Sequence, residues 1–396
     1  MQITSDTIAE YADQVIDDVI KWRRYLHQNP ELSFHEVNTA QFVFDTLQSF
    51  GELELSRPTR TSVMARLIGP NPGKTLALRA DMDALPITEE TGLPFASQNP
   101  GVMHACGHDG HTAILLGTAK ILAGMKEQIN GEVRFLFQHG EEQFPGGAQE
   151  MVKAGCMDGV DMVIGLHLDS QRETGQIALL SGPYYAAPDS FEITVIGKGG
   201  HAAYPHETVD SVAVAAQVIT NLQQIVSRTT NPLDSLVLSV STIAGGQAHN
   251  VIPGKVTMTG TVRSFQPAFR QSVPERMEAV IRGVTAAHGA SYEFRYTRGY
   301  DPVINDEKLT NLVRATLVSV FGEEALPPVE RQMGGEDFSA YLQKAPGTFF
   351  DIGAGNVAKG IVAPHHHPRF TIDEDALLIG VKAFVNIAYN LLNRKD

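Results

Sequence analysis

The chain of 396 residues carries 31 lysine and arginine residues against 45 aspartate and glutamate residues, which gives a formal net charge of −14. This acidic balance, with no basic stripe to offset it, argues against nucleic acid as a partner. Apolar residues make up 43% of the sequence, but their runs are short and interrupted, which argues against a membrane span. A chain of this length exceeds one ordinary core and predicts two or three domains that act on a small molecule.

The cysteines and the first residues predict a cytoplasmic protein. The two cysteines, Cys106 and Cys156, are too few for a disulfide framework, which fits a reducing compartment. The first six residues have neither the basic flank nor the apolar core of a signal peptide.

Two helices are expected at the start of the chain. Apolar residues recur at helical spacing over 5–29, which predicts a long amphipathic helix. Ser33 and Glu36 then have the spacing of a capping box, which predicts the start of a second helix that ends near Gly51.

Three apolar stretches, 75–79, 133–137 and 162–166, are predicted to be buried strands with helical patterns between them. Each is followed by ionisable residues, namely Asp81, Asp83, His139, Glu141, Glu142 and His167. In an open α/β sheet, ligands bind outside the carboxyl ends of the strands. We therefore expect these side chains to gather at one edge of a central sheet.

The pattern changes near residue 188. Strands are expected over 191–196, 236–243, 255–262 and 292–296, and helices over 207–227 and 268–287. This β-α-β-β-α-β order is that of a ferredoxin-like unit. After it the α/β pattern resumes, with a helix from about 306, a strand over 348–352 and a last helix from Asp373. The sequence thus predicts an α/β domain of residues 1–187 and 302–396, interrupted by an inserted domain of residues 188–301.

The stretch 103–111 has a composition that no helix or strand requires. It contains His104, Cys106, His108, Asp109 and His111. Imidazole, thiolate and carboxylate are ligands that zinc accepts. Together with the carboxylates expected at the sheet edge, they suffice for two metal ions that share a ligand. The alternatives for this stretch are a cysteine nucleophile, Cys106 with His108, and a polar structural turn.

The adjacent pair Glu141 and Glu142 directly follows a predicted buried strand. Neighbouring side chains diverge at a strand end, so one can bind metal while the other takes a proton from a metal-bound water as general base. The alternative is a solvated acidic loop, which the preceding buried strand disfavours.

Seven motifs extend the pattern from residue 79 to residue 370: Arg79–Pro86, His104–His111, Gly140–Glu142, Gly199–His201, Asn250–Pro253, Gly334–Phe338 and His366–Phe370. With them the chain resembles the metal-dependent amidohydrolases of the aminoacylase/carboxypeptidase superfamily. The resemblance is strongest to the hippurate hydrolase-like and auxin-conjugate hydrolase-like branch, and within it to the bacterial N-acyl-L-amino acid amidohydrolases.

This resemblance implies that the α/β domain is catalytic and binds two divalent metal ions, Zn²⁺ or alternatively Co²⁺, Mn²⁺ or Ni²⁺. The implied ligands are Cys106, His108, Glu142, His167 and His366. Cys106 would bridge the two ions as a thiolate, and Glu141 would be the catalytic base. Among His365, His366 and His367, only the family pattern His-x-Pro-x-Phe selects His366. Asp81 and Asp83 are expected behind the ligands, where they orient them.

In relatives, the inserted domain is a lid and a dimerisation surface. The resemblance implies that His201 helps catalysis and that Asn250 helps to bind the substrate, since a placed donor stabilises the developing oxyanion. Arg263 is a candidate for the substrate carboxylate, although a surface salt bridge explains it almost as well. Gly335 is expected to line the substrate cleft, where glycine lets the backbone approach a ligand.

The expected activity is hydrolysis of the amide bond of N-acyl amino acids by a metal-bound water that Glu141 activates. The expected protein is a homo-oligomer, a dimer or tetramer, joined through the lid domain. A dipeptidase or carboxypeptidase, or an N-acetyl-diaminopimelate-type deacetylase, is the alternative on the same scaffold. A cysteine-nucleophile amidase and a non-catalytic small-molecule binding protein are alternatives of other classes.

Overall fold

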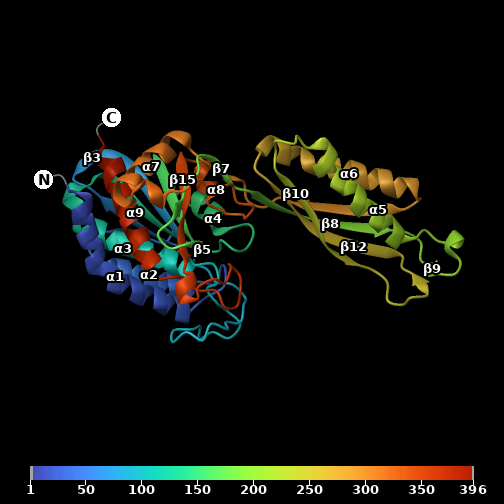
Figure 1. Cartoon of the computed structure of the whole chain (residues 1–396), viewed down its shortest axis with the longest axis horizontal. Coiled ribbons are helices and arrows are strands. Elements are labelled where there is room, and N and C mark those ends of the chain that lie inside the picture. Colours follow the sequence, from blue (N-terminus) through green and yellow to red (C-terminus); the bar gives the residue numbers. More distant parts are fainter. Residues whose placement is uncertain (1–2, 395–396) are drawn as a thin grey trace. The chain divides into compact units, whose positions relative to one another are not determined.

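The computed structural model describes residues 3–394 and contains two compact units (Figure 1). The first comprises Met1–Tyr184, Ile304–Glu330 and Asp337–Asp396, and the second comprises Tyr185–Val303 and Arg331–Glu336. The short segment Arg331–Glu336, which the sequence division assigns to the first domain, groups with the second unit. Its backbone explains this, because Ala186 N donates to the carbonyl oxygens of Gln332 and Gly334 at 3.1 Å.

A mixed sheet forms the centre of the first unit, with the order β1-β2-β4-β3-β5-β15-β6. Its strands are β1 (Glu54–Ser56), β2 (Val63–Ile68), β3 (Asn71–Asp81), β4 (Asn130–Gln138), β5 (Met162–Glu173), β6 (Ile177–Ala178) and β15 (Gly347–Gly355). β4, β3, β5 and β15 are parallel, so their carboxyl ends meet at one edge. β4 and β15 are buried over most of their length, as strands covered on both faces are.

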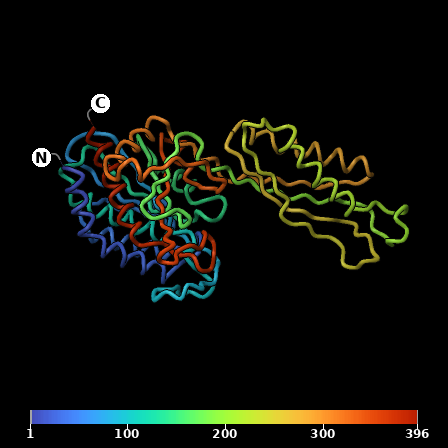
Figure 2. Tube along the Cα trace, viewed as in Figure 1, coloured from blue at the N-terminus to red at the C-terminus, as the bar shows by residue number. Residues whose placement is uncertain are grey.

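Helices cover this sheet. They are α1 (Ser5–Gln28), α2 (Val37–Ser49), α3 (His108–Gly124), α4 (Gly147–Lys153), α7 (Glu307–Phe321), α8 (Ser339–Leu342) and α9 (Asp375–Asn393). The first and last helices, α1 and α9, lie side by side and both pack against α3 (Figure 2). The N-terminal and C-terminal parts of the chain therefore share one core.

Within the described residues, α9 is the helix long and apolar enough to cross a membrane. Of its most apolar window, 72% is buried inside the fold. An apolar helix buried on most sides is typical of a protein core, and packing against the sheet accounts for its composition.

The second unit is ferredoxin-like, as predicted. Its elements are β8 (Ala187–Ile196), α5 (Ser211–Gln224), β10 (Leu236–Ala244), β12 (Lys255–Ser264), α6 (Pro267–Ala287) and β13 (Ser291–Thr297). The sheet order is β10-β12-β8-β13 with antiparallel neighbours, and α5 and α6 share a core with it. Two small sheets complete the fold, β9 (Gly200–His201) with β11 (Val251–Ile252) and β7 (Gly182–Tyr185) with β14 (Val303–Asn305).

The capping box predicted at Ser33 and Glu36 is wrong. Helix α2 begins at Val37 with no side-chain hydrogen bond at its N-cap in the described part of the chain. Ser33 Oγ instead donates to Asp83 Oδ2 at 2.6 Å. Glu36 Oε1 accepts hydrogen bonds from the backbone N–H groups of Phe34 and Gly140. Tertiary partners thus take both side chains away from the helix end.

Candidate metal centre

The carboxyl ends of the parallel strands deliver the predicted side chains to one place. Asp81 is the last residue of β3, Glu141 and Glu142 follow β4, and His167 lies in β5. β5 continues past His167 to Glu173, further than the apolar stretch predicts. All of these residues are buried or half-buried.

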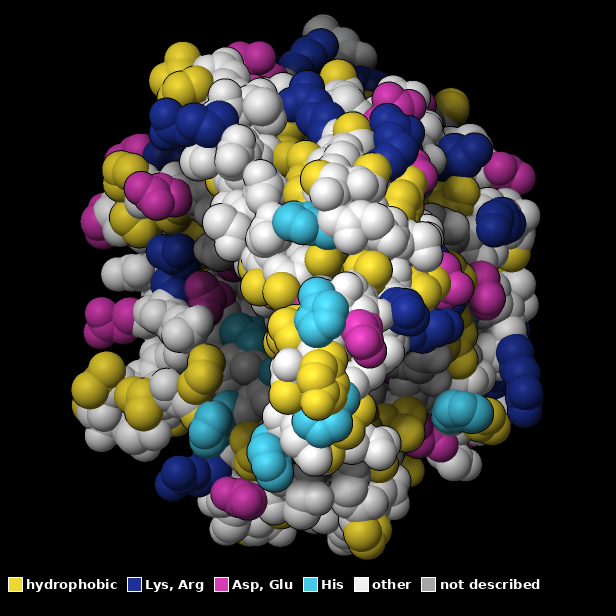
Figure 3. All heavy atoms as spheres, turned by 90° about the vertical axis from the view of Figure 1, so that its right-hand side faces the viewer, with side chains coloured by type: hydrophobic (Ala, Val, Ile, Leu, Met, Phe, Trp, Pro, Cys, Tyr) yellow, Lys and Arg dark blue, Asp and Glu magenta, His cyan; other side chains and the backbone are white. Residues whose placement is uncertain are grey.

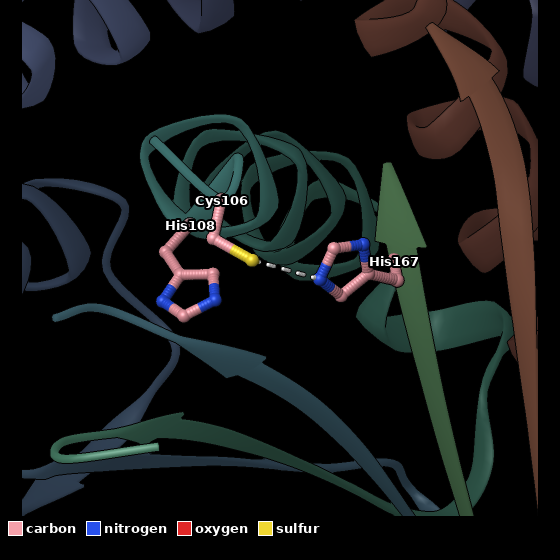
Figure 4. Close-up of side chains that lie close together, drawn as sticks. All are labelled: Cys106, His108 and His167. Atoms are coloured by element: carbon pink, nitrogen blue, oxygen red, sulfur yellow. Dashed lines mark hydrogen bonds between the residues drawn. The ribbon is translucent and has the colours of Figure 1, made fainter. Parts of the chain in front are cut away.

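Cys106 and His108 reach the same place from the start of α3. Gly107 between them has φ 96°, a left-handed conformation that glycine adopts without strain. The turn brings the Cys106 sulfur between the rings of His108 and His167 (Figure 4). Cys106 Sγ lies 3.5 Å from His167 Nε2, and the ligand atoms of the three residues lie within 4.8 Å of one another.

A second group shares the same thiol. The ligand atoms of Cys106, Glu142 and His366 also lie within 4.8 Å of one another. His366 Nε2 is 3.1 Å from Glu142 Oε1. Cys106 is therefore common to two sets of three ligand-type residues, which is the arrangement that a bridging ligand requires.

Hydrogen bonds leave one nitrogen of each histidine facing this centre. His108 Nδ1 lies 2.9 Å from the carbonyl oxygen of Asp83, which can only accept, so this nitrogen donates. In the same way, His167 Nδ1 donates to the carbonyl oxygen of Leu168 at 3.0 Å. His108 Nε2 is buried and has no hydrogen-bond partner among residues 3–394. Metal-binding histidines are typically held in this way through their second nitrogen.

Asp81 and Asp83 lie behind the ligand-type residues. Asp81 Oδ1 accepts from His111 Nδ1 at 2.7 Å, and Asp81 Oδ2 is 2.7 Å from Arg79 Nη1. His111 Nε2 accepts from the backbone N–H of Leu168, so both of its nitrogens are engaged. Asp83 Oδ2 accepts from Glu142 N at 3.0 Å.

The three consecutive histidines point in different directions. His366 adopts a left-handed backbone conformation, φ 63°, and turns toward Glu142. His365 Nδ1 lies 3.7 Å from Cys106 Sγ. His367 Nδ1 accepts from the backbone N–H of Arg369 within its own loop. The fold thus separates three residues that spacing alone cannot distinguish.

The charges around Cys106 favour a bound cation. Burial raises the pKa of the Cys106 thiol well above its usual value, and the carboxylates of Glu142, Glu141 and Asp81 raise it further. Burial also keeps the pKa of His167 well below its usual value, so this ring is neutral. A thiolate in such surroundings needs a positive charge beside it, and a divalent metal ion supplies one. The donor set of thiol, imidazole and carboxylate fits such an ion.

Carboxylates around His108 favour the charged form of its ring. Burial by itself would lower the pKa of His108, but Asp81, Asp83 and Glu142 raise it to about 10. A metal ion at this nitrogen would take the place of that proton.

The inserted unit brings His201 and Asn250 together. His201 lies on β9 opposite Val251 of β11, and Ala202 N donates to the carbonyl oxygen of Asn250 at 3.0 Å. Both side chains are exposed. Figure 3, which faces the β9 end of this unit, shows histidine side chains at the surface there.

Arg263 and Gly335 lie at the other end of the same unit. Arg263 pairs with Pro188 across β12 and β8, and a Cβ atom on Gly335 would lie 2.4 Å from Pro188 Cγ. Within β8, the chain from Pro188 to Ile196 extends about 26 Å toward the His201 end. The packing against Pro188 is a structural reason for glycine at position 335.

The structure also shows a buried network that was not predicted from the sequence. His27 is fully buried, and its Nδ1 and Arg23 Nε both lie 2.8 Å from Asp109 Oδ2. From the sequence, His27 reads as an ordinary core or surface residue. The sequence did contain an indication of this network, because Arg23 and His27 are four positions apart and interrupt the apolar face of α1. Their partner Asp109 follows His108, so the network anchors the start of α3.

Comparison with known proteins shows the family and the relatives to which the chain is similar. The family described as peptidase family M20/M25/M40 matches residues 77–390. The N-acyl-L-amino acid amidohydrolase of Geobacillus stearothermophilus is 63% identical over 303 residues, which cover 76% of this chain and 82% of the relative. Thermostable carboxypeptidase 1 of Saccharolobus solfataricus is 41% identical over 384 residues, which cover 96% of this chain and 97% of the relative.

A solved structure agrees with these matches. The crystal structure of the YXEP protein of Bacillus subtilis, described as a dinuclear metal binding peptidase from the M20 family, has a TM-score of 0.82 and 36% identity. The similarity covers 96% of this chain and 99% of that one. The resemblance to metal-dependent amidohydrolases is thus confirmed, and the protein is an enzyme, a hydrolase. The chain belongs to peptidase family M20/M25/M40.

Proposed function

We propose that the protein hydrolyses the amide bond of N-acyl amino acids to a carboxylic acid and a free amino acid, in the cytoplasm. The observation that carries the proposal is that Cys106 is shared by two ligand groups, with Glu141 next to Glu142 at the same strand end. The name of the relative with 63% identity supports this choice of substrate.

The metal centre would contain two divalent ions, zinc or alternatively cobalt, manganese or nickel. The residues that would hold them are Cys106, His108, Glu142, His167 and His366. When bound, such ions polarise an amide carbonyl and lower the pKa of a water molecule.

Glu141 would act as the general base. It is 7% exposed, and its ligand atom lies within 4.8 Å of those of His108 and Glu142. Its carboxylate would accept a proton from the attacking water and then transfer it to the nitrogen of the leaving amine. Asp81 and Asp83 would keep His111, His108 and the loop of Glu142 in place.

The inserted unit would act as a lid over the catalytic domain. His201 would donate a hydrogen bond to the oxygen on which negative charge develops, and Asn250 would bind the substrate. Arg263 would bind the substrate carboxylate, and Gly335 would line the cleft. Because about 26 Å of β8 separates these residues from the His201 end, one small substrate would meet both pairs only if the pairs came from two subunits.

The same unit would join subunits into a dimer or tetramer. β10 is an edge strand, and from Thr242 to Ala244 its residues are exposed. An exposed edge offers unpaired backbone groups to a second strand. Light scattering of the purified protein measures its molar mass and so tests for a dimer or tetramer.

The deciding experiment combines metal analysis with a substrate panel before and after chelation. The panel pairs N-acetyl and N-benzoyl amino acids with dipeptides, because a relative with 41% identity is named a carboxypeptidase. We expect bound metal, turnover of N-acyl amino acids, loss of activity on chelation and recovery with zinc, cobalt or manganese. Chelator-resistant activity that alkylation of Cys106 abolishes would indicate a cysteine nucleophile instead.

A further inference from the structure

Two buried carboxyl groups hold the loop that carries Glu141. The backbone N–H of Gly140 donates to Glu36 Oε1 at 2.7 Å, and the backbone N–H of Glu142 donates to Asp83 Oδ2 at 3.0 Å. Glu141 lies between these two attached peptide groups. The direction in which its side chain leaves the loop therefore depends on Glu36 and Asp83.

The main role of the Glu36 side chain is this hydrogen bond with Gly140. Its side chain is fully buried, and Oε1 also accepts the backbone N–H of Phe34 at 2.9 Å. Oε2 is buried without a hydrogen-bond partner in the described range. Burial of a carboxyl group in this way costs free energy. Helix α2 does not use the side chain as a cap, so its own helix offers no reason for the residue.

The backbone around Glu36 transmits its position to Gly140. Phe34 has φ 65°, and its ring packs against Gly140, where a Cβ atom would lie 2.9 Å from Phe34 Cζ. Gly140 itself has φ 59°. Two left-handed residues in contact thus join the segment 34–36 to the loop after β4.

We propose that Glu36 is a positioning residue for the catalytic base. Its hydrogen bond to Gly140 sets the orientation of Glu141, and this inference rests on the proposed role of Glu141. A displacement of about 1 Å in a reacting group can cost about 100-fold in rate. The segment before α2 would therefore influence turnover without touching the substrate.

The test compares Glu36→Ala, Glu36→Gln and a matched control. Glu36→Ala removes the acceptor, and we expect kcat to fall by about 100-fold while KM and metal content stay near those of the wild type. Glu36→Gln keeps an acceptor oxygen of the same length, and we expect it to retain kcat within about tenfold. Glu31→Ala is the control, because Glu31 also accepts two backbone N–H groups, those of Asn38 and Thr39, at the start of α2. We expect it to lower the melting temperature and leave kcat unchanged.

A double mutant separates positioning from general damage. In the Glu141→Gln background, adding Glu36→Ala should have no further effect on the residual rate, because residues that act as one unit are not additive. A further loss of about 100-fold in that background would overturn the proposal, and so would a wild-type kcat in Glu36→Ala. If Glu36→Ala does not fold, Glu36→Asp replaces it, since the shorter carboxyl group draws away from Gly140.

Failure of the proposed function would look different. If Glu141→Gln itself kept wild-type turnover, Glu141 would not be the base, whatever Glu36→Ala did. If Glu141→Gln lost turnover and Glu36→Ala did not, the base would stand and the positioning role would be wrong.

Discussion

His108 donates its Nδ1 hydrogen to the carbonyl oxygen of Asp83 at 2.9 Å, which leaves Nε2 as the nitrogen that faces Cys106 and Glu142. The side chain of Asp83 holds the backbone N–H of Glu142. One residue thus orients ligand-type groups on two different elements, the start of α3 and the loop after β4.

Glu141→Gln should keep its metal and lose turnover. The amide has the size of the carboxylate but cannot accept the proton of the attacking water, so we expect kcat to fall by about 1,000-fold. Metal content, measured by mass spectrometry of the purified variant, should equal that of the wild type. Glu127→Gln, an exposed glutamate in the 3₁₀ turn after α3, is the control and should keep full activity. Equal losses in both variants would refute the assignment of the base.

Metal binding should release protons. Carboxylates raise the pKa of His108 to about 10 and burial raises that of the Cys106 thiol, so both carry protons at pH 7 in the metal-free protein. Ligation removes both, and His366 adds to the number because its hydrogen bond with Glu142 raises its pKa. We therefore expect at least two protons released per chain. Calorimetric titration with zinc in buffers of different ionisation enthalpy measures this number. Zinc binding to the His108→Gln variant should release about one proton fewer. An unchanged number of released protons would show that His108 is not a metal ligand.

His366→Ala should lose metal, whereas His367→Ala should not. His366 faces Glu142, while His367 accepts a hydrogen bond from Arg369 within its own loop. We expect at least a tenfold weaker metal affinity for His366→Ala in competition with a chelator. His367→Ala differs by one position in the chain and serves as the matched control. Weaker binding in His367→Ala alone would contradict the orientation of this loop.

Glu36 should make stability depend on pH. Burial, with Asp83 beside it, raises the pKa of Glu36 to about 7 from the ordinary 4.5. Between these values the unfolded chain has lost the proton that the folded protein keeps, so the free energy of unfolding falls as pH rises through this window. The loss amounts to about 3 kcal/mol and ends above pH 7, where the folded protein ionises too.

Glu36→Gln removes this titration. Urea unfolding of both metal-free proteins at pH 4.5, 6 and 8 measures the difference in their free energies of unfolding. We expect the variant to gain stability relative to the wild type as the pH rises. If the free energies of unfolding of the two proteins instead changed in parallel with pH, the pKa of Glu36 would be ordinary in the folded protein.

The elements were predictable because their signals are local. The parallel strands β3, β4 and β5 are apolar stretches followed by ionisable residues, and the β-α-β-β-α-β order of the insertion is readable from periodicity. Hydrophobic periodicity arises from neighbours in the chain, so the sequence carries it directly. The residue types around Cys106 likewise identify a metal-binding stretch before any fold is known.

The partners of buried polar groups were not predictable in this way. Ser33 and Glu36 have the local pattern of a capping box, yet Asp83 and Gly140, 50 and 104 residues away, take their side chains. Arg23 likewise finds Asp109 across 86 residues. A hydrogen bond needs two groups within about 3 Å, and for distant residues only the packing of helices and strands decides which groups meet.

For this protein, the sequence by itself determined the parallel strands β3, β4, β5 and β15, the ferredoxin-like order of the insertion and, through the resemblance of its motifs, the family. It did not reveal β1, β2 and β6 of the same sheet. The tertiary structure decided that Cys106 stands between two ligand groups, that His366 rather than its neighbours faces Glu142, and that Glu36 holds the loop of Glu141. The physical reason is the separation along the chain of the groups that interact. Secondary structure follows from side chains a few residues apart, whereas a site requires groups from distant segments to converge.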